Sequence, residues 1–323
     1  CMSFRVVNLD NGAETGKLRG NVVLGRKNRP QDYDGRVTTD GVEVDEYERV
    51  PGAIHDREVS RNHLLVAENP DWLEESQLNS GTEKVPTGQM DLDVWDLNSL
   101  SGTHIEEYDS KTGHPVYSIG DHSIEVRPLN HYLGIAGPDE KSLGVENNVE
   151  SLADNLEGRG FETETVSEAS WKDVDQRLDR LGHATEEESS TLIMYTGHGD
   201  YSGNMSLSDR KVDPSEFIER VDDLAGDKAV VVDQCFAGNF AGYDVPDDMA
   251  VYMASGAGEK TQGNSIIAGE KRTRYAGRIV EAIESETGSV DMDEIHARVA
   301  SVSKVADNKP DREGSTPDLS RIK

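Results

Sequence analysis

Two short apolar runs in the second half of the chain mark its predicted centre. They are residues 191–195 and residues 229–232, and glycine and polar residues bound each of them. Runs of this length are typical of central strands that are buried on both faces of a parallel sheet covered by helices. The segment between them places Phe217, Val221 and Leu224 at near-helical spacing, so the pattern predicts a strand, a helix and a second strand.

Apolar residues recur at helical spacing in further segments of this half, namely residues 144–157, 171–181, 277–283 and 292–302. We expect their Val, Leu and Trp side chains to form the buried faces of helices rather than a site. Together with the two strands, these helices predict an α/β domain with a mainly parallel central sheet flanked by helices.

From residue 4 to residue 127 the pattern is one of strands and turns. Clusters of Gly, Asn, Pro and Asp separate short alternating or apolar pieces at residues 4–7, 21–24, 63–67, 92–97, 103–105 and 122–126. This arrangement predicts an all-β sandwich. Residues 127–130 are the only joint to the α/β part, so we predict two domains, residues 1–128 and residues 129–323.

The balance of charged residues predicts a strongly acidic surface. The 323 residues include 33 Lys and Arg against 63 Asp and Glu, which gives a net charge of -30. Acid spread through the whole sequence is a mark of proteins kept soluble in high salt, although an ordinary acidic protein would fold in the same way. So negative a field argues against nonspecific binding to nucleic acid or to an anionic membrane.

Cysteine usage and the lack of long apolar runs indicate the compartment. Cys1 and Cys235 are the two cysteines, so a disulfide framework is excluded and a reducing environment is expected. The chain shows no apolar run long enough for a signal peptide or a membrane span. We therefore expect a cytoplasmic protein.

Each of the two central strands is followed by a reactive side chain. His198 follows the first run and Cys235 follows the second. Neighbouring parallel strands end at the same edge of a sheet, where ligands bind, so the two side chains are expected to meet there. A thiol titrates near pH 8.5 and needs a neighbouring imidazolium or aligned amides to become a thiolate nucleophile. Taken singly, a buried thiol and a hydrogen-bonded turn histidine would explain them, and Cys1 is a competing but poorly placed nucleophile.

This pattern resembles the caspase-like cysteine peptidases, which include caspases, metacaspases, legumains and gingipains. In that group a His-Gly pair ends one strand and a cysteine ends the next. The resemblance extends to the segments expected to be the first strand, the following helix, the strand after the cysteine and the closing segment, at residues 131–136, 147–160, 248–255 and 315–320. It covers residues 130–323.

The resemblance implies roles for individual residues. Cys235 would attack a peptide carbonyl, His198 would handle the proton, and the backbone amides of Gly199 and Cys235 would face the oxyanion. Gly197 and Gly199 would leave room for the substrate backbone. Asp233 matches an acidic position in metacaspases that helps to bind Arg or Lys before the scissile bond, although it could instead bond a loop amide.

Two regulatory features follow from the same resemblance. Residues 256–274 read as a mobile, glycine-rich loop and offer Lys260, Lys271, Arg272 and Arg274 as candidate self-cleavage sites. Metacaspases often require calcium, but no oxygen-ligand loop of recognisable spacing occurs here, so we predict no cofactor and leave calcium open.

Three pieces of the first domain, in order, resemble a forkhead-associated (FHA) domain. They are a basic cluster at residues 25–29, residues 59–63 and residues 96–103. By resemblance, Arg26 and Ser60 would hold a phosphothreonine phosphate, because a guanidinium and a small hydroxyl suit its oxygens. The other residues implied are Arg61 and Ser101 in the binding loops and Gly25, His63 and Gly102 in supporting positions. Leu100-Ser101-Gly102 departs from the usual Thr-Asn-Gly, which weakens the expected peptide contact.

The sequence therefore predicts a cysteine endopeptidase that cleaves after Arg or Lys and is recruited or regulated through phosphothreonine partners. The rival class is a binding or scaffold protein with an inactive peptidase-like fold. The presence of both His198 and Cys235 argues against it. A phosphatase is disfavoured because no arginine follows Cys235 to bind phosphate.

Overall fold

The protein divides into two compact units, Cys1–Leu129 and Asn130–Lys323. The sequence placed the boundary between residues 128 and 129. The computed structural model describes residues 3–10, 13–14, 17–19, 22–24, 37–39, 42–44, 48–49, 64–67, 82–85, 93–97, 103–112, 114–119, 122–139, 143–261, 264–267, 270–286, 290–302 and 311–314. Each unit is described by itself below.

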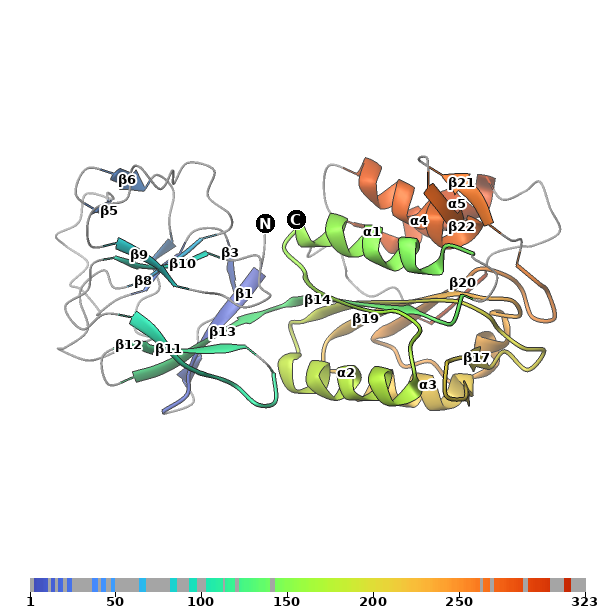
Figure 1. Ribbon diagram of the computed structural model, residues 1–323, viewed down its shortest axis with the longest axis horizontal. Helices are drawn as coiled ribbons and strands as arrows, with labels where there is room; N and C mark the ends of the chain where they lie inside the picture. Colours follow the sequence, from blue (N-terminus) through green and yellow to red (C-terminus); the bar gives the residue numbers. More distant parts are fainter. Residues whose placement is uncertain are drawn as a thin grey trace. The chain divides into compact units, whose positions relative to one another are not determined.

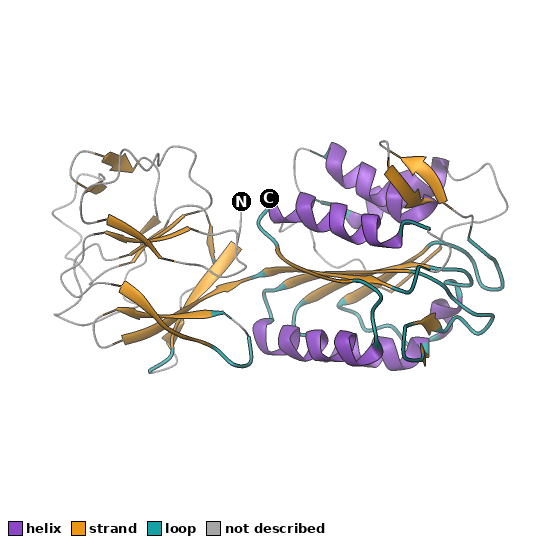
Figure 2. Cartoon of the chain, in the orientation of Figure 1, coloured by secondary structure: helices purple, strands orange, loops and turns teal. Residues whose placement is uncertain are grey.

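The described elements of the first unit are strands (Figure 2). They are β1 (Ser3–Asn8), β2 (Ala13–Glu14), β3 (Leu18–Arg19), β4 (Val22–Leu24), β5 (Val37–Thr39), β6 (Val42–Val44), β7 (Glu48–Arg49), β8 (Leu64–Ala67), β9 (Thr82–Val85), β10 (Asp93–Leu97), β11 (Thr103–Tyr108), β12 (Pro115–Ile119) and β13 (His122–Pro128). One sheet has the order β11-β12-β13-β1-β2, with β3 also on β1, and another the order β7-β4-β8-β10-β9. Each of the six predicted strand pieces contains a strand.

The second unit is built on a sheet of alternating strands and helices. Its elements are β14 (Asn130–Ala136), α1 (Val145–Glu157), β15 (Glu162–Val166), α2 (Trp171–Ala184), β16 (Ser190–Thr196), β17 (Met205–Ser206), β18 (Lys211–Val212), α3 (Pro214–Asp222), β19 (Asp227–Asp233), the short 3-10 helix η2 (Asn239–Gly242), β20 (Met249–Met253), β21 (Asn264–Ile267), β22 (Glu270–Thr273), α4 (Arg274–Ser285), α5 (Met292–Val302) and β23 (Asp311–Gly314).

The central sheet of this unit has the order β15-β14-β16-β19-β20-β23. Its strands are parallel except for β23, which pairs antiparallel with β20. Helices α1, α4 and α5 cover one face of the sheet, and α2 and α3 cover the other (Figure 1). The predicted α/β fold with a mainly parallel, helix-flanked sheet is therefore confirmed.

Alternation along the central strands explains why both faces are dry. In β16, Leu192 and Met194 pack with α1, α4 and α5, whereas Ile193 and Tyr195 pack with α2 and α3. Successive side chains of a strand point to opposite faces, so a strand that feeds two cores is apolar throughout. Every residue of β16 is buried, which is the source of the unbroken run in the sequence.

Helices α2 and α3 begin where capping residues in the sequence predict. Ser170 accepts a hydrogen bond from the Asp173 amide while the Asp173 side chain bonds back to the Ser170 amide, which forms a capping box at the start of α2. Asp213 caps α3 through the Ser215 amide, and Pro214 occupies the first turn of that helix. These caps fix the two helices that support the lower face of the sheet in Figure 1.

Two expectations for this unit differ from the structure. The run read as a mobile loop, residues 256–274, contains the hairpin of β21 and β22 and the first residue of α4, so the loop prediction was wrong there. Pairing between two strands of four residues each produces the hairpin, and the glycine content of the run hid it. Strand β15 was not predicted at all. The predicted closing segment, residues 315–320, lies outside the described residues, and β23 ends just before it.

Among the residues that the structure describes, no helix combines the length and the apolar character that a membrane crossing requires.

Candidate active site

Strand register brings the two predicted reactive residues to one edge of the sheet. β16 and β19 run parallel, and their last residues, Thr196 and Asp233, are paired. The Gly197 amide then donates to the Asp233 carbonyl at 3.0 Å. His198 and Cys235 are each the second residue beyond that last pair. The prediction that both follow strands ending at a common edge is therefore met by the pairing itself.

The backbone of His198 is fixed by its own loop. The Tyr195 hydroxyl donates to the His198 carbonyl at 3.0 Å, and the Ser206 amide donates to the same oxygen at 2.9 Å. Gly199 and Met205 form a bridge that closes the loop into a narrow turn. His198 is thus held two residues beyond the sheet with its side chain partly exposed.

The loop that carries Cys235 is strained directly after the cysteine. Phe236 has φ 61°, in the left-handed region that residues with a side chain rarely adopt. Its amide donates to the Glu259 carbonyl at 2.7 Å, which ties the loop to the segment after β20. From the same segment, the Thr261 Oγ1 lies 3.5 Å from the Cys235 Sγ. Cys235 is a free, partly exposed thiol.

The two loops are locked to each other by backbone and side-chain contacts. A methyl group on Gly199 would lie 2.2 Å from the Cys235 carbonyl oxygen, so only glycine permits this approach. The Gln234 side chain donates through Nε2 to the Gly203 carbonyl at 2.7 Å, and the Asn239 side chain donates through Nδ2 to the Tyr201 carbonyl at 3.0 Å. The edge is therefore one rigid assembly rather than two independent turns.

Contacts within the protein explain why position 197 holds a glycine. A methyl group there would lie 2.5 Å from the Tyr195 hydroxyl, and that hydroxyl holds His198. At Gly199 the obstacle is the Cys235 loop. Close contacts within the protein thus account for both glycines, and the room that they would leave for a substrate backbone stays a prediction.

Within the described residues, no hydrogen bond joins the His198 imidazole to Cys235 or to a third side chain that would orient it. Catalytic hydrogen bonds are often long without substrate and tighten when it binds. The amides of Gly199 and Cys235 also donate to no acceptor in the described part of the chain, so both donors are available at the edge where the sulfur lies.

Asp233 lies deeper than the two reactive residues. Asp233 is buried, with 3 % of its surface exposed. One carboxylate oxygen, Oδ2, accepts from the Thr273 hydroxyl, from the Thr196 hydroxyl at 3.4 Å and from the Ala276 amide at 3.2 Å. Ala276 lies in the first turn of α4, so the carboxylate acts as a cap supplied by another element. The alternative reading of Asp233, a bond to a backbone amide, describes these contacts, and its role in substrate selection stays a prediction.

Burial disfavours the charged form of the Asp233 carboxyl group. Loss of solvent raises the pKa of this carboxyl group, and the hydrogen bonds from Thr273, Ala276 and Thr196 offset only part of that rise. The network continues to α1, because the side-chain nitrogen Nδ2 of Asn148 donates to the Thr196 and Thr273 hydroxyls. The floor beneath the two loops is therefore a connected polar network inside an apolar core.

Sequence reasoning missed several residues at this edge. Thr261 contacts Cys235, Gln234 bonds to the His198 loop at Gly203, and Tyr201 packs on Phe236. The sequence offered no signal for any of the three. Each comes into place through tertiary contacts rather than through a motif. The signal that was available, a reactive residue after each apolar run, identified the two loops but not what surrounds them.

The phosphopeptide residues predicted from the FHA resemblance all lie outside the described residues. They are Arg26, Ser60, Arg61 and Ser101, with the supporting Gly25, His63 and Gly102. Cys1 also lies outside them. Across the described ranges, no group of three or more His, Cys, Asp or Glu side chains is placed to hold a metal ion.

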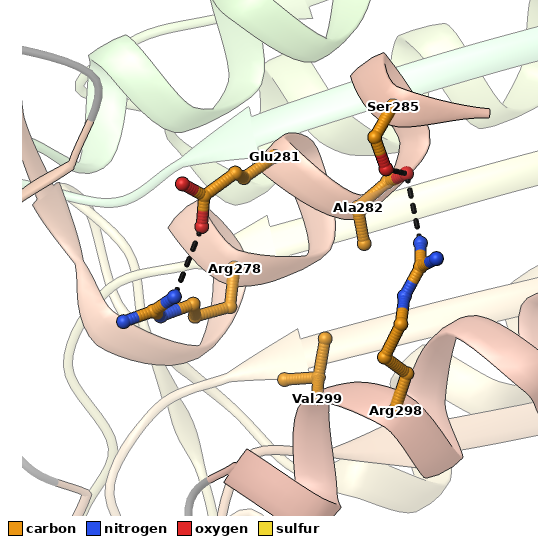
Figure 3. A pocket seen from close by; sticks show the side chains of 6 residues that line it. All are labelled: Arg278, Glu281, Ala282, Ser285, Arg298 and Val299. Carbon is orange, nitrogen blue, oxygen red and sulfur yellow. Dashed lines mark hydrogen bonds and ion pairs between the residues drawn. The ribbon is translucent and has the colours of Figure 1, made fainter.

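A surface pocket of about 270 Å³ lies elsewhere, along α4 and α5 (Figure 3). It is lined by Arg278, Glu281, Ala282, Ser285, Arg298 and Val299. Arg278 is paired with Glu281 at 3.1 Å, and Arg298 donates to the Ala282 carbonyl at 2.9 Å. Its cations are thus already engaged, and it includes neither His198 nor Cys235.

Comparison with known proteins agrees with the fold. The caspase domain family matches residues 131–315, which is more than half of the 323 residues. A crystal structure of caspase-1 from Spodoptera frugiperda is similar at 12 % identity with a TM-score of 0.46, over 59 % of this chain and 86 % of that one. No curated protein matches. The match of the family over both candidate loops and the whole central sheet means that the chain belongs to the caspase domain family.

Proposed function

We propose that the second unit is a cysteine endopeptidase that uses Cys235 as nucleophile and His198 as general acid and base. The observation that carries the proposal is the register of β16 and β19. Because Thr196 and Asp233 are the last paired residues, His198 and Cys235 each come two residues after the paired part of their strands. Members of the caspase domain family are cysteine peptidases, and this chain keeps both residue types at that edge.

The chemistry follows from the positions of the groups. His198 takes the proton of the Cys235 thiol, the sulfur attacks the peptide carbonyl carbon, and the carbonyl electron pair moves to oxygen, which faces the Gly199 and Cys235 amides. Collapse of this intermediate breaks the C–N bond, and His198 gives its proton to the leaving amine. Water then attacks the thioester, passes a proton to His198 and releases the acid product and the thiol.

Preference for Arg or Lys before the scissile bond is the finer proposal, and Asp233 is the residue that would supply it. All three of its hydrogen bonds go to Oδ2, which leaves Oδ1 for a cationic side chain. An anionic carboxylate in a low-dielectric setting favours a cation and repels an acidic side chain. Asp233→Asn would then lower kcat/KM for Arg and Lys peptides while leaving cleavage after Asn no worse.

Quenched-fluorescence peptides with Arg, Lys, Asn or Asp before the scissile bond test the peptidase function directly. Wild type is expected to cleave Arg or Lys peptides, and Cys235→Ala and His198→Ala are expected to lose about 10³-fold or more of that rate. Cleavage retained by Cys235→Ala contradicts the nucleophile. Preference for Asp or Asn contradicts the basic specificity alone.

Self-cleavage is proposed for the segment that follows β20. Its exposed basic candidates are Lys260, Lys271 and Arg274. Arg272 is 3 % exposed and bonds to the Ser151 hydroxyl at 2.9 Å, so it is the least accessible of the four. Mass spectrometry after incubation in high salt is expected to show fragments from wild type and none from Cys235→Ala. An intact wild-type chain contradicts this.

For the first unit, the proposal is recognition of phosphothreonine proteins through an FHA-type surface with Arg26 and Ser60. It rests on the three sequence pieces alone. Wild type and Arg26→Ala are to be compared on a phosphothreonine peptide library. Binding no better than that of unphosphorylated controls removes this proposal and leaves the peptidase intact. A catalytically inactive scaffold is the competing function, and the peptide panel above separates the two.

A further inference from the structure

The structure leaves a large aromatic side chain open to solvent beside the candidate dyad. Tyr201 is 79 % exposed, the highest value among the exposed large hydrophobic residues of the described ranges. It follows His198 by three residues in the same loop. Exposed aromatic rings that sit on a fixed backbone are a recurring means of binding apolar groups of a ligand, because they bury large area with little loss of entropy.

The Tyr201 ring is held on the Cys235 loop. Its centroid lies 4.7 Å from that of Phe236, with the planes tilted by 39°. Phe236 is itself 4 % exposed and has the strained backbone described above. The Tyr201 ring therefore packs against a buried neighbour of the nucleophile, while most of the residue remains exposed to solvent.

The backbone of the Tyr201 loop is clamped as firmly as its ring. The Tyr201 carbonyl accepts from the Asn239 Nδ2 at 3.0 Å, and the Gly203 carbonyl accepts from the Gln234 Nε2 at 2.7 Å. Gly203 has φ 83°, and a methyl group there would lie 2.6 Å from the Asn239 Cβ. A ring presented from so constrained a turn does not need to be ordered when a ligand arrives, which lowers the cost of binding.

The loop that carries Tyr201 indicates which part of a peptide substrate this residue would contact. His198 must reach the leaving nitrogen, so the part of a peptide after the scissile bond passes over the His198 loop. Thr261 borders the sulfur from a different segment. Tyr201 belongs to the His198 loop, so the residue or two that follow the scissile bond are the part of a substrate that it would meet.

We propose that Tyr201, supported by Phe236, forms a subsite for a large apolar side chain at the first or second position after the scissile bond. The inference rests on the proposed peptidase function and adds to it a preference that is independent of charge. Charge selection weakens as salt screens it, whereas apolar contact does not. In a chain with a net charge of -30, such a contact keeps its strength at high ionic strength.

The test is a set of quenched peptides with one fixed sequence before the scissile bond and Gly, Ala, Leu or Phe at each of the two positions after it. The measured quantity is the ratio of kcat/KM for the Leu or Phe peptide to that for the Gly peptide. For wild type a ratio of about three to ten is expected at one of the positions. Because each variant serves as its own reference, a general loss of activity does not change the ratio.

Three variants separate the subsite from a general effect on the loop. Tyr201→Ala is expected to bring the ratio to about one, and Tyr201→Phe is expected to keep it because the ring remains. Tyr108→Ala is the matched control, since Tyr108 is a 53 % exposed tyrosine in the first unit, and it should leave every rate unchanged. An undiminished ratio in Tyr201→Ala, or a ratio of one in an active wild type, overturns the subsite alone. Failure of wild type to cleave any peptide overturns the peptidase function and the subsite with it.

Discussion

Asp233 shows how one buried carboxylate serves structure before it serves chemistry. Its Oδ2 joins three elements, because its donors come from β16, from the end of β22 and from the first turn of α4. A buried carboxylate costs free energy in its charged form unless hydrogen bonds compensate. Here burial raises the pKa of the carboxyl group, so the hydrogen bonds compensate for only part of the cost of its charge.

The sign of the resulting pH dependence is fixed. A raised folded-state pKa contributes stability that is complete below the unfolded pKa and is lost as pH rises through the folded pKa. Asp233→Asn removes the ionisation and keeps an acceptor oxygen. We expect its free energy of unfolding to exceed that of wild type by about 1 kcal/mol at pH 7.5 and to equal it near pH 3.5.

Urea denaturation at several pH values measures this difference. Asp222→Asn is the control, since Asp222 is exposed at the end of α3, and no comparable pH-dependent gain is expected. A variant that is less stable than wild type by the same amount at every pH would contradict the account of Asp233.

Thr261 offers a second prediction at this scale. Its hydroxyl lies 3.5 Å from the Cys235 sulfur, and a hydroxyl that donates to a thiolate stabilises the reactive form. Thr261→Val keeps the shape and removes the donor, so alkylation of Cys235 at pH 7.5 is expected to slow by about three- to tenfold. Thr261→Ser should restore the rate. Equal slowing in both variants would mean that Thr261 acts only through packing.

These residues mark the limit of sequence reasoning. The positions of His198 and Cys235 beyond the ends of neighbouring strands could be predicted, because each follows an apolar run typical of a buried strand. Thr261 could not, because its position depends on a turn held by the Glu259 carbonyl and the Phe236 amide. The partners of Asp233 could not be predicted either, since they come from elements about forty residues away in the chain.

At the scale of elements, the approach of the two loops is the feature that matters. The Gly199 backbone meets the Cys235 carbonyl so closely that no side chain fits between them. Gly199→Ala is therefore expected to separate the loops and to lower kcat/KM by about 10²-fold or more, while the fold persists, because misplacement by about 1 Å is that costly. Gly242→Ala is the matched control, since a methyl group at Gly242 meets nothing within 4 Å.

Peptide hydrolysis and far-UV circular dichroism on both glycine variants distinguish the outcomes. Full activity in Gly199→Ala would contradict the close approach as a requirement for function. Loss of activity in Gly242→Ala to the same degree would point to general fragility of the edge.

Elements with strong apolar patterns were predictable, and those without them were not. α2 and α3 carry clear periodic faces and begin at Asp or Ser caps, so pattern and capping agree. β15 has partly exposed residues over most of its length because it is the edge strand of the sheet, and an edge strand needs no apolar run. The hairpin of β21 and β22 is defined by the pairing of its strands, which composition does not reveal, so the glycine-rich run was read as a loop.

At the scale of the whole molecule, the net charge of -30 is the dominant property. Like charges on one chain oppose the compact state, and salt reduces that repulsion. Raising KCl from about 0.15 M to about 1 M shortens the screening length from about 8 Å to about 3 Å. We expect the midpoint of thermal unfolding to rise by about 5 °C or more over this range and to level off above it.

Thermal scans across KCl concentrations measure this effect in the Cys235→Ala chain, which excludes loss by self-cleavage. A midpoint that does not change, or that falls, would contradict a surface adapted to salt. The interpretation of composition as an adaptation to high salt depends on this result, since an acidic surface alone folds in either setting.

The central claim is that His198 activates Cys235 at the edge of the sheet, and alkylation with iodoacetamide followed by peptide mapping tests it most directly. Cys1 is the other cysteine of the chain and serves as the reference within the same sample. We predict that at pH 7 Cys235 is labelled about tenfold faster than Cys1 and that His198→Ala removes this excess. Equal labelling of the two cysteines in wild type, or an unchanged excess in His198→Ala, would contradict the account.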